Sequence, residues 1–201
     1  MTEKIKIAIF GGSGYGGSEL LRILLFHPAA EIVLVTANEH AGKRVSAVHR
    51  NLLGLTDLEF EKAPVDLSGV TDIDVAFFGL PHGQALSLIP QLPAGVKAID
   101  LSGDFRLDDA ELHERFYKTE HGGDHQQGFV YGLTETDREA IRSAERIANP
   151  GCFATASLLA MAPMAKSGLL KGSVIIDAKT GSSGSGAKPA TNTHHPQRMN
   201  S

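Results

Sequence analysis

Short apolar runs alternate with helix-like stretches along most of the chain, and this pattern predicts a layered α/β fold. Near-continuous apolar runs of about four to eight residues are typical of strands buried on both faces. They predict strands at Lys4–Phe10, Glu31–Ala37, Asp74–Leu80, Val96–Leu101 and Ser173–Ala178. Helical spacing predicts helices at Ser18–His27, Gly83–Gln91, Asp108–Tyr117 and Thr155–Ala165. The repetition of strand, helix and strand indicates a Rossmann-like, doubly wound parallel sheet with helices on both faces.

The pattern changes after Asn149, which divides the chain into two expected domains. Residues 1–148 carry the strand and helix repeats, and residues 149–201 begin a second, α+β domain. The polar end of the chain contains no clear final element, so we expect the chain to stop inside this second domain. Its glycine- and serine-rich stretch, residues 180–187, is either a flexible linker or an ordered loop after a strand.

Composition excludes several classes of protein. The chain has 201 residues, of which 42% are hydrophobic, and a net charge of −4, which argues against a nucleic-acid or membrane-surface binder. No apolar run approaches the roughly 18 residues of a membrane span, and the N-terminus resembles neither a signal nor a transit peptide. A single cysteine cannot form an intrachain disulfide. We therefore expect a cytoplasmic protein, and nothing in the sequence predicts a metal site.

A glycine-rich segment lies directly between the first predicted strand and the first predicted helix. Gly11, Gly14 and Gly17 give the spacing GxxGxxG. Glycines permit a tight turn and let the backbone approach a pyrophosphate, whose charge then lies at the helix N-terminus. The segment is either a structural turn or a dinucleotide-binding loop, and its place between a strand and a helix favours the second interpretation.

The end of the second predicted strand bears on which nucleotide binds. NAD-binding proteins usually place Asp or Glu there to bind the ribose 2′-hydroxyl. The residues found there are the small set Thr36, Ala37 and Asn38. Lys43 and Arg44 follow a little later and suit a 2′-phosphate, although they are equally compatible with a solvated surface. We therefore predict NADP(H) rather than NAD, and Glu39 is the residue that argues the other way.

The single cysteine follows a turn sequence and precedes a helical run. Asn149-Pro150-Gly151 shapes the turn, which places Cys152 at or near a helix N-terminus. The partial positive charge there favours the thiolate over the thiol. Cys152 is either a small buried hydrophobic residue or an activated thiol. A thiolate beside a nicotinamide can attack an acyl phosphate or an aldehyde, which is the chemistry of phosphorylating aldehyde dehydrogenases.

Six segments, in order, resemble the N-acetyl-gamma-glutamyl-phosphate reductase family of the aspartate-semialdehyde dehydrogenase superfamily. They are FGGSGYGGSELLRIL (Phe10–Leu24), GLPHG (Gly79–Gly83), DLSGDFRL (Asp100–Leu107), YGLTE (Tyr131–Glu135), NPGCFATA (Asn149–Ala156) and DAKTGSSGSG (Asp177–Gly186). The resemblance covers nearly all of the chain, and six ordered motifs are far more specific than one glycine loop.

The resemblance implies a role for each matching residue. Cys152 matches the nucleophile, and Arg106 and Asn149 match substrate-binding positions, with Arg106 on the substrate phosphate. The alternative for Arg106 is a structural ion pair with Asp104 or Asp108. The cofactor-binding positions are Gly11, Ser13, Gly14, Tyr15 and Gly16 at the pyrophosphate, Thr36, Ala37 and Asn38 at the adenosine ribose, Pro81 on the cofactor side of the cleft, and Ser182, Ser183 and Gly184 near the nicotinamide.

The chain also departs from the family pattern. Phe153-Ala154 replaces the usual tyrosine-proline after the cysteine, and Lys188 represents an expected basic residue. Residues 193–198 resemble the branch that includes the lysine-biosynthesis relative. The family's catalytic histidine lies in a later HRHxPE-type motif that this sequence lacks, and His194 and His195 are not assigned its role. We therefore expect an incomplete chain that binds the cofactor but catalyses poorly or not at all.

By resemblance, the whole protein is an NADPH-dependent reductase of arginine biosynthesis. It is expected to convert N-acetyl-γ-glutamyl phosphate to N-acetylglutamate 5-semialdehyde and phosphate through a cysteine thioester, as a homodimer or homotetramer. One alternative is reduction of an aminoadipyl or glutamyl phosphate held on a small carrier protein, as in the lysine-biosynthesis relative. The other is a non-catalytic NADP-binding module.

Overall fold

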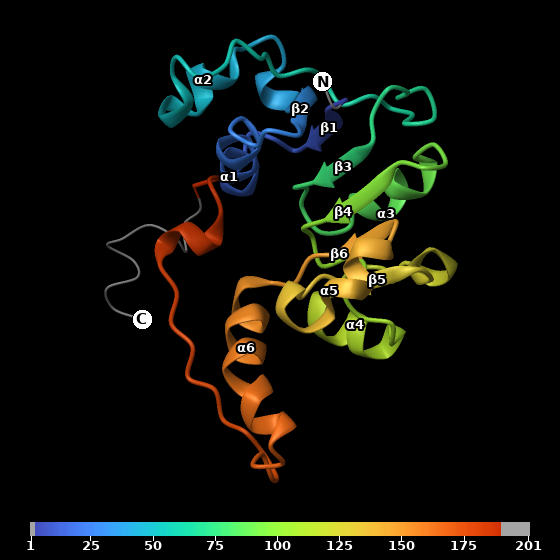
Figure 1. The fold of residues 1–201 in the computed structure, drawn as a ribbon, viewed down its shortest axis with the longest axis vertical. Coiled ribbons are helices and arrows are strands. Elements are labelled where there is room, and N and C mark those ends of the chain that lie inside the picture. Colours follow the sequence, from blue (N-terminus) through green and yellow to red (C-terminus); the bar gives the residue numbers. More distant parts are fainter. Residues whose placement is uncertain (1–2, 190–201) are drawn as a thin grey trace.

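Six strands form one sheet in which every neighbouring pair is parallel (Figure 1). The computed structural model describes residues 3–189, so the tail residues 193–198 discussed above lie outside the described residues. The strands are β1 (Ile5–Phe10), β2 (Ala30–Thr36), β3 (Val75–Phe78), β4 (Lys97–Asp100), β5 (Phe129–Tyr131) and β6 (Arg146–Ala148). Their order is β2-β1-β3-β4-β6-β5. This arrangement confirms the predicted parallel α/β fold.

Each face of the sheet packs on its own hydrophobic core. Side chains of β1 alternate between the faces: Ile7 and Ile9 belong to one cluster, and Ala8 and Phe10 belong to the other. Leu21 of helix α1 (Tyr15–Leu24) packs into the first cluster. The second cluster contains Ala85 of α3 (Ala85–Leu88). Burial on both sides explains why the strands read as continuous apolar runs.

The helices agree with the predicted ones in place but differ at their ends. Besides α1 and α3 they are α2 (Val45–Val48), α4 (Ala110–Tyr117), α5 (Thr134–Ser143) and α6 (Cys152–Lys166). The predicted helix Gly83–Gln91 is a short α-helix followed by a 3₁₀ turn, Ile89–Gln91. The sequence pattern did not predict α2, α5, β5 or β6. The two strands have only three residues each, too few to show a period.

Helix α6 extends away from the sheet, and the chain after it runs back as an extended segment (Figure 1). The strand predicted at Ser173–Ala178 is wrong, because the structure has no strand there. A strand needs a neighbour to satisfy its backbone groups, and no described strand pairs with this segment. Its apolar side chains are consequently exposed, with Ile175 at 96%.

Parallel strands place all their carboxyl ends at one edge of the sheet. The strand order reverses at β1, because β2 pairs with one side of it and β3 with the other. In open α/β sheets, ligands bind outside the carboxyl ends of the strands at such a reversal. The loops after β1 and β3 therefore define where a site is expected.

Candidate functional site

The loops after β1 and β3 touch each other at the reversal point. Gly11 follows β1 with a φ of +80°, and a Cβ at this position would lie 2.4 Å from the carbonyl oxygen of Gly79. Gly79 follows β3, and its N–H donates to the carbonyl of Phe10 at 2.8 Å. Only glycine combines this backbone conformation with so close an approach. Gly11 is therefore needed to close the two loops together.

The remaining glycines of the first loop fall into two groups. A Cβ on Gly12 would lie 2.3 Å from Val35 Cγ1, and one on Gly17 would lie 2.3 Å from the Gly12 carbonyl oxygen. These glycines let the loop and helix α1 pack closely. In the described part of the chain, no atom lies within 4 Å of the position of a Cβ on Gly14. Gly14 faces open space, where a ligand can approach the backbone.

Helix α1 offers uncapped backbone N–H groups beside this open space. It begins at Tyr15, and within residues 3–189 its N-cap Gly14 makes no side-chain capping hydrogen bond. Its first turn contains no acidic residue. Tyr15 and Gly16 are exposed, and Ser13 is half-buried. Because the N-terminus of a helix carries a partial positive charge, this arrangement suits an anionic group such as a pyrophosphate.

The three residues predicted at the adenosine ribose have different environments. Thr36 is buried, and its hydroxyl accepts a hydrogen bond from the Gly11 N–H at 3.3 Å. Ala37 is also buried. Asn38 is exposed, and its side-chain oxygen accepts from the Ala63 N–H at 3.0 Å. Asn38 therefore offers its side chain to the surface, whereas Thr36 supports the glycine loop from below.

His49 also holds the glycine loop, and the sequence reasoning missed it. Its Nε2 donates to the Gly12 carbonyl oxygen at 2.8 Å, and the side chain is buried with its ring edge against Phe60. The N–H of Gly12 donates to the Thr36 carbonyl at 2.8 Å. Both polar groups of the Gly12 backbone are thus fixed. No motif marks His49, because it follows α2, far from the loop in sequence.

Arg106 lies against the turn that precedes Cys152. Its Nε donates to the Asn149 carbonyl at 2.7 Å, and its Nη2 donates to the Leu101 carbonyl at 2.8 Å. A Cβ on Gly151 would lie 3.1 Å from Arg106 Nη1, so the guanidinium reaches the N-cap of α6. Within residues 3–189 the structure has no ion pair between Arg106 and an acidic residue. The guanidinium therefore joins the loops after β4 and β6.

Cys152 is the first residue of α6, as predicted, and its side chain is exposed. The buried alternative for this cysteine is therefore wrong. Tyr131, the last residue of β5, belongs to the same edge of the sheet. Burial raises the pKa of the Tyr131 hydroxyl, and the positive charge of Arg106 acts in the opposite direction. An exposed thiol, a helix N-terminus and a guanidinium are thus gathered at the carboxyl ends of the strands.

The last residue of β4 and the segment that follows it carry two buried carboxyl groups. Asp100 accepts hydrogen bonds from the Ser102 N–H at 3.0 Å and from the Ser102 hydroxyl at 2.7 Å. Burial raises the pKa of Asp100 to about 6, although these hydrogen bonds oppose the rise. Asp104 is also fully buried and accepts two backbone hydrogen bonds from the loop after β3. Sequence reasoning assigned no role to Asp100 or Ser102, and it gave Asp104 only as an ion-pair partner of Arg106.

The predicted residues near the nicotinamide are not joined to the rest of the site. Ser182, Ser183 and Gly184 lie in an exposed 3₁₀ turn. In the described part of the molecule, no hydrogen bond connects this turn to the glycine loop or to Cys152. Pro81, by contrast, lies exposed in the loop after β3, two residues beyond Gly79.

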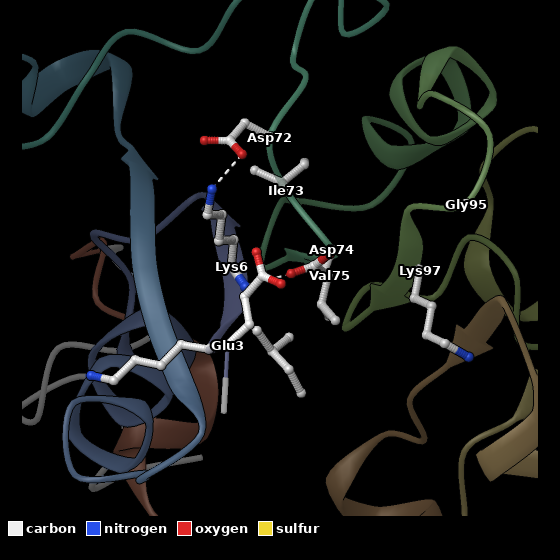
Figure 2. A pocket seen from close by; sticks show the side chains of 10 residues that line it. Glu3, Lys6, Asp72, Ile73, Asp74, Val75, Gly95 and Lys97 are labelled. Carbon is white, nitrogen blue, oxygen red and sulfur yellow. Dashed lines mark hydrogen bonds and ion pairs between the residues drawn. The ribbon is translucent and has the colours of Figure 1, made fainter. Parts of the chain in front are cut away.

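A cavity lies at the opposite edge of the sheet (Figure 2). It has a volume of about 710 Å³ and is lined by residues at the amino ends of β1, β3 and β4. Two of its lysines already have partners: Lys6 Nζ pairs with Asp72, and Lys97 Nζ donates to the Ala144 carbonyl at 2.8 Å. The cavity is remote from the strand ends where the glycine loop and Cys152 lie, so it is not the candidate site.

The reversal of strand order beneath a glycine loop and a helix N-terminus defines a dinucleotide-binding fold of the Rossmann class. Residues 6–144 match the family model of the semialdehyde dehydrogenase NAD-binding domain. Residues 152–201 match the semialdehyde dehydrogenase dimerisation domain. The chain belongs to the semialdehyde dehydrogenase family and carries its NAD(P)-binding domain.

Similar curated proteins carry two kinds of name. A LysW-L-2-aminoadipate/LysW-L-glutamate phosphate reductase of Saccharolobus solfataricus is 45% identical over 100% of this chain and 57% of its own length. An N-acetyl-gamma-glutamyl-phosphate reductase of Archaeoglobus fulgidus is 45% identical over 96% of this chain and 56% of its own length. The chain thus spans little more than half the length of these relatives.

Solved structures support the fold. Aspartate semialdehyde dehydrogenase II of Vibrio cholerae superposes with a TM-score of 0.56 at 21% identity, over 82% of this chain and 47% of that one. The Candida albicans aspartate semialdehyde dehydrogenase, solved with NADP, gives a TM-score of 0.56 at 16% identity, over 83% of this chain and 48% of that one.

Among the described residues, we find no helix with the length and apolar character needed to cross a bilayer.

Proposed function

We propose that the protein is an NADPH-dependent reductase of an acyl phosphate, and that its substrate is N-acetyl-γ-glutamyl phosphate. The products are N-acetylglutamate 5-semialdehyde and phosphate, a step of arginine biosynthesis. One observation carries this proposal: the Arg106 guanidinium lies against the turn before Cys152, at the same sheet edge as the glycine loop. In this proposal residues 1–148 bind NADP(H), and residues 149–201 begin the catalytic domain.

The proposed chemistry begins at the Cys152 sulfur. As a thiolate, this sulfur attacks the acyl carbon of the substrate. The carbon–oxygen bond to phosphate breaks, phosphate leaves, and a thioester forms. Arg106 Nη1, the guanidinium nitrogen nearest Gly151, is placed to bind the substrate phosphate, and the Asn149 backbone holds that guanidinium in place. A bound NADPH would supply a hydride to the thioester carbon; the carbon–sulfur bond would then break, releasing the semialdehyde and returning Cys152 as the thiolate.

The proposed cofactor site follows the exposed backbone of the first loop. The backbone of Ser13, Gly14, Tyr15 and Gly16 would hold the pyrophosphate at the N-terminus of α1. Asn38 is the exposed member of the set predicted near the adenosine ribose, and Thr36 and Ala37 shape the floor beneath it. Lys43 and Arg44, both exposed, would bind a 2′-phosphate. The nicotinamide side of the proposed cofactor site would be completed by Pro81 and by the later turn, with Ser182, Ser183 and Gly184.

A carrier-bound substrate is the second candidate. The Saccharolobus solfataricus relative, named for LysW-linked substrates, is as similar to this chain as the N-acetyl-gamma-glutamyl-phosphate reductase of Archaeoglobus fulgidus, at 45% identity each. Both candidates use the same thiol chemistry and differ in the group attached to the acyl chain. A non-catalytic NADP-binding module, the third possibility, has no need of an exposed thiol beside an arginine.

We also propose that the protein forms a homo-oligomer, a dimer or tetramer. Helix α6 is mostly apolar, yet in the described part of the chain none of its residues is buried. An apolar helix of this kind is normally covered by other protein. The match of residues 152–201 to a dimerisation domain supports the same view. Light scattering on the purified protein tests this proposal, and a monomer at all concentrations would contradict it.

Acylation of Cys152 tests the proposed function directly. The protein is incubated with N-acetyl-γ-glutamyl phosphate or with carrier-bound aminoadipyl phosphate, without NADPH, and the peptides are analysed by mass spectrometry. We expect acyl transfer to the Cys152 peptide, none in Cys152→Ser, and equal NADPH affinity in both proteins. The acyl phosphate that reacts faster identifies the substrate. An unacylated protein that still binds NADPH supports the non-catalytic module instead.

A further inference from the structure

The segment Asp100–Arg106, which begins at the last residue of β4, lies between two loops that the proposed function uses. At one end, Asp104 binds the loop after β3: its Oδ1 accepts from the Gly83 N–H at 2.7 Å, and its Oδ2 accepts from the Ala85 N–H at 3.1 Å. At the other end, Arg106 binds the turn before Cys152. The segment therefore connects the cofactor side of the site with the thiol side.

A second set of contacts fixes the same loop. The Gly103 N–H donates to His82 Nδ1 at 2.7 Å, and the Tyr117 ring meets the His82 ring edge-on at a centroid distance of 5.6 Å. A Cβ on Gly103 would lie 2.2 Å from Tyr117 Cε1, so the segment, the loop and α4 are tightly packed. The loop from His82 to Ala85 is thus held at three of its four residues.

Asp104 is itself anchored to the end of β4. Its N–H donates to the Ser102 hydroxyl oxygen at 3.1 Å, and that hydroxyl donates to Asp100 Oδ2 at 2.7 Å. Asp104 is fully buried, and no described basic side chain forms an ion pair with it. Burying a charge in this way is costly unless its hydrogen bonds are used. Only a carboxylate gives each of two N–H donors an oxygen acceptor, which explains an aspartate here.

We propose that Asp104 is a positioning residue for the cofactor. It fixes the loop His82–Ala85, next to Pro81, on the nicotinamide side of the strand reversal. The inference rests on the proposed function, because it assumes that a dinucleotide lies across the carboxyl ends of β1, β2 and β3. The adenosine half of such a ligand lies toward β2, so the other half extends over β3 and β4, where Asp104 acts.

The experiment compares two ligands in three proteins. Binding of NADPH and of 2′,5′-ADP, which lacks the nicotinamide half, is measured by calorimetry for wild type, Asp104→Asn and Asp124→Asn. The Asp104→Asn side chain would set an amide N–H against a backbone N–H. Asp124→Asn is the matched control, because it removes one charge from an exposed side chain. We expect Asp104→Asn to weaken NADPH binding about tenfold and to leave 2′,5′-ADP binding unchanged.

Each outcome decides between specific explanations. Equal weakening of both ligands by Asp104→Asn would indicate general destabilisation and would overturn the positioning role, as would unchanged NADPH binding. If wild type itself binds neither ligand, the proposed function fails independently of Asp104. Should Asp104→Asn fail to fold, Ser102→Ala serves as the second variant, since it removes the hydroxyl that links the Asp104 N–H to Asp100. It should weaken NADPH binding about threefold with the same selectivity, and equal effects on both ligands would overturn the proposal.

Discussion

Replacing Asp100 by Asn tests the consequence of burying a carboxyl at the end of β4. Burial raises the pKa of Asp100 from 3.8 to about 6. Between these pH values the folded protein keeps a proton that the unfolded chain releases. Protonation therefore favours the folded state: the stabilising contribution is complete below pH 3.8 and is lost as pH rises through 6. Asparagine does not titrate, so Asp100→Asn lacks this pH dependence.

The size of the effect follows from the rise in pKa. Each pKa unit corresponds to about 1.4 kcal/mol, so a rise of about two units is worth about 3 kcal/mol over the whole titration. About 2 kcal/mol of this change in the free energy of unfolding falls between about pH 4.5 and pH 8, because the rest occurs below pH 4.5. The altered hydrogen bonds to Ser102 in Asp100→Asn add a difference that does not change with pH. The diagnostic quantity is therefore the slope.

Urea unfolding followed by circular dichroism measures this slope. We expect the free energy of unfolding of wild type, relative to Asp100→Asn, to fall by about 2 kcal/mol from about pH 4.5 to pH 8. Asp66→Asn is the control: Asp66 is exposed, and hydrogen bonds from Ser68 lower its pKa from 3.8. It titrates below this range, so its curve should run parallel to that of wild type. Parallel curves for wild type and Asp100→Asn would refute the raised pKa of Asp100.

Three other substitutions test the glycine loop, the guanidinium and the nucleotide preference. Gly17→Ala places a methyl group 2.3 Å from the Gly12 carbonyl oxygen and should lower the free energy of unfolding by about 2 kcal/mol. Gly14→Ala should leave the urea midpoint unchanged and weaken NADPH binding; equal midpoints in the two variants would contradict this difference. Arg106→Lys keeps the charge but loses the paired bonds to Asn149 and Leu101. If Arg106 binds phosphate, added phosphate should change the rate of Cys152 alkylation in wild type but not in Arg106→Lys, and an equal response in both proteins would argue against a phosphate site. Arg44→Ala should weaken NADPH binding about threefold to tenfold without changing NADH binding, and a parallel loss for both would exclude a 2′-phosphate contact.

The central strands could be predicted because they are buried on both faces. In β1, residues of the two hydrophobic cores alternate within the apolar run Ile7–Phe10. The segment Ser173–Ala178, where a strand was predicted and does not form, has a similar composition. What it lacks is a neighbour, since no described strand pairs with it. Local pattern reports the capacity to form a strand, whereas pairing decides whether the strand forms.

The site was predictable where one motif contains both the turn and its chemistry. Gly11, Gly14 and Cys152 fall into that class, because a turn between a strand and a helix places them at the ends of parallel strands. The residues that hold these turns in place do not belong to that class. His49 reaches Gly12 from 37 positions away, and Arg106 reaches Asn149 from 43 positions away. Such contacts depend on the order of strands in the sheet, and no local sequence pattern indicates that order. For Arg106 the resemblance indicated a phosphate site, and the structure adds that two of its donors already hold the backbone beside the thiol. A lysine carries all its donors on one nitrogen and cannot reach the two carbonyls as the separate Nε and Nη2 atoms do. The guanidinium makes both bonds and still offers Nη1, so it is suited to bind phosphate and support the turn together.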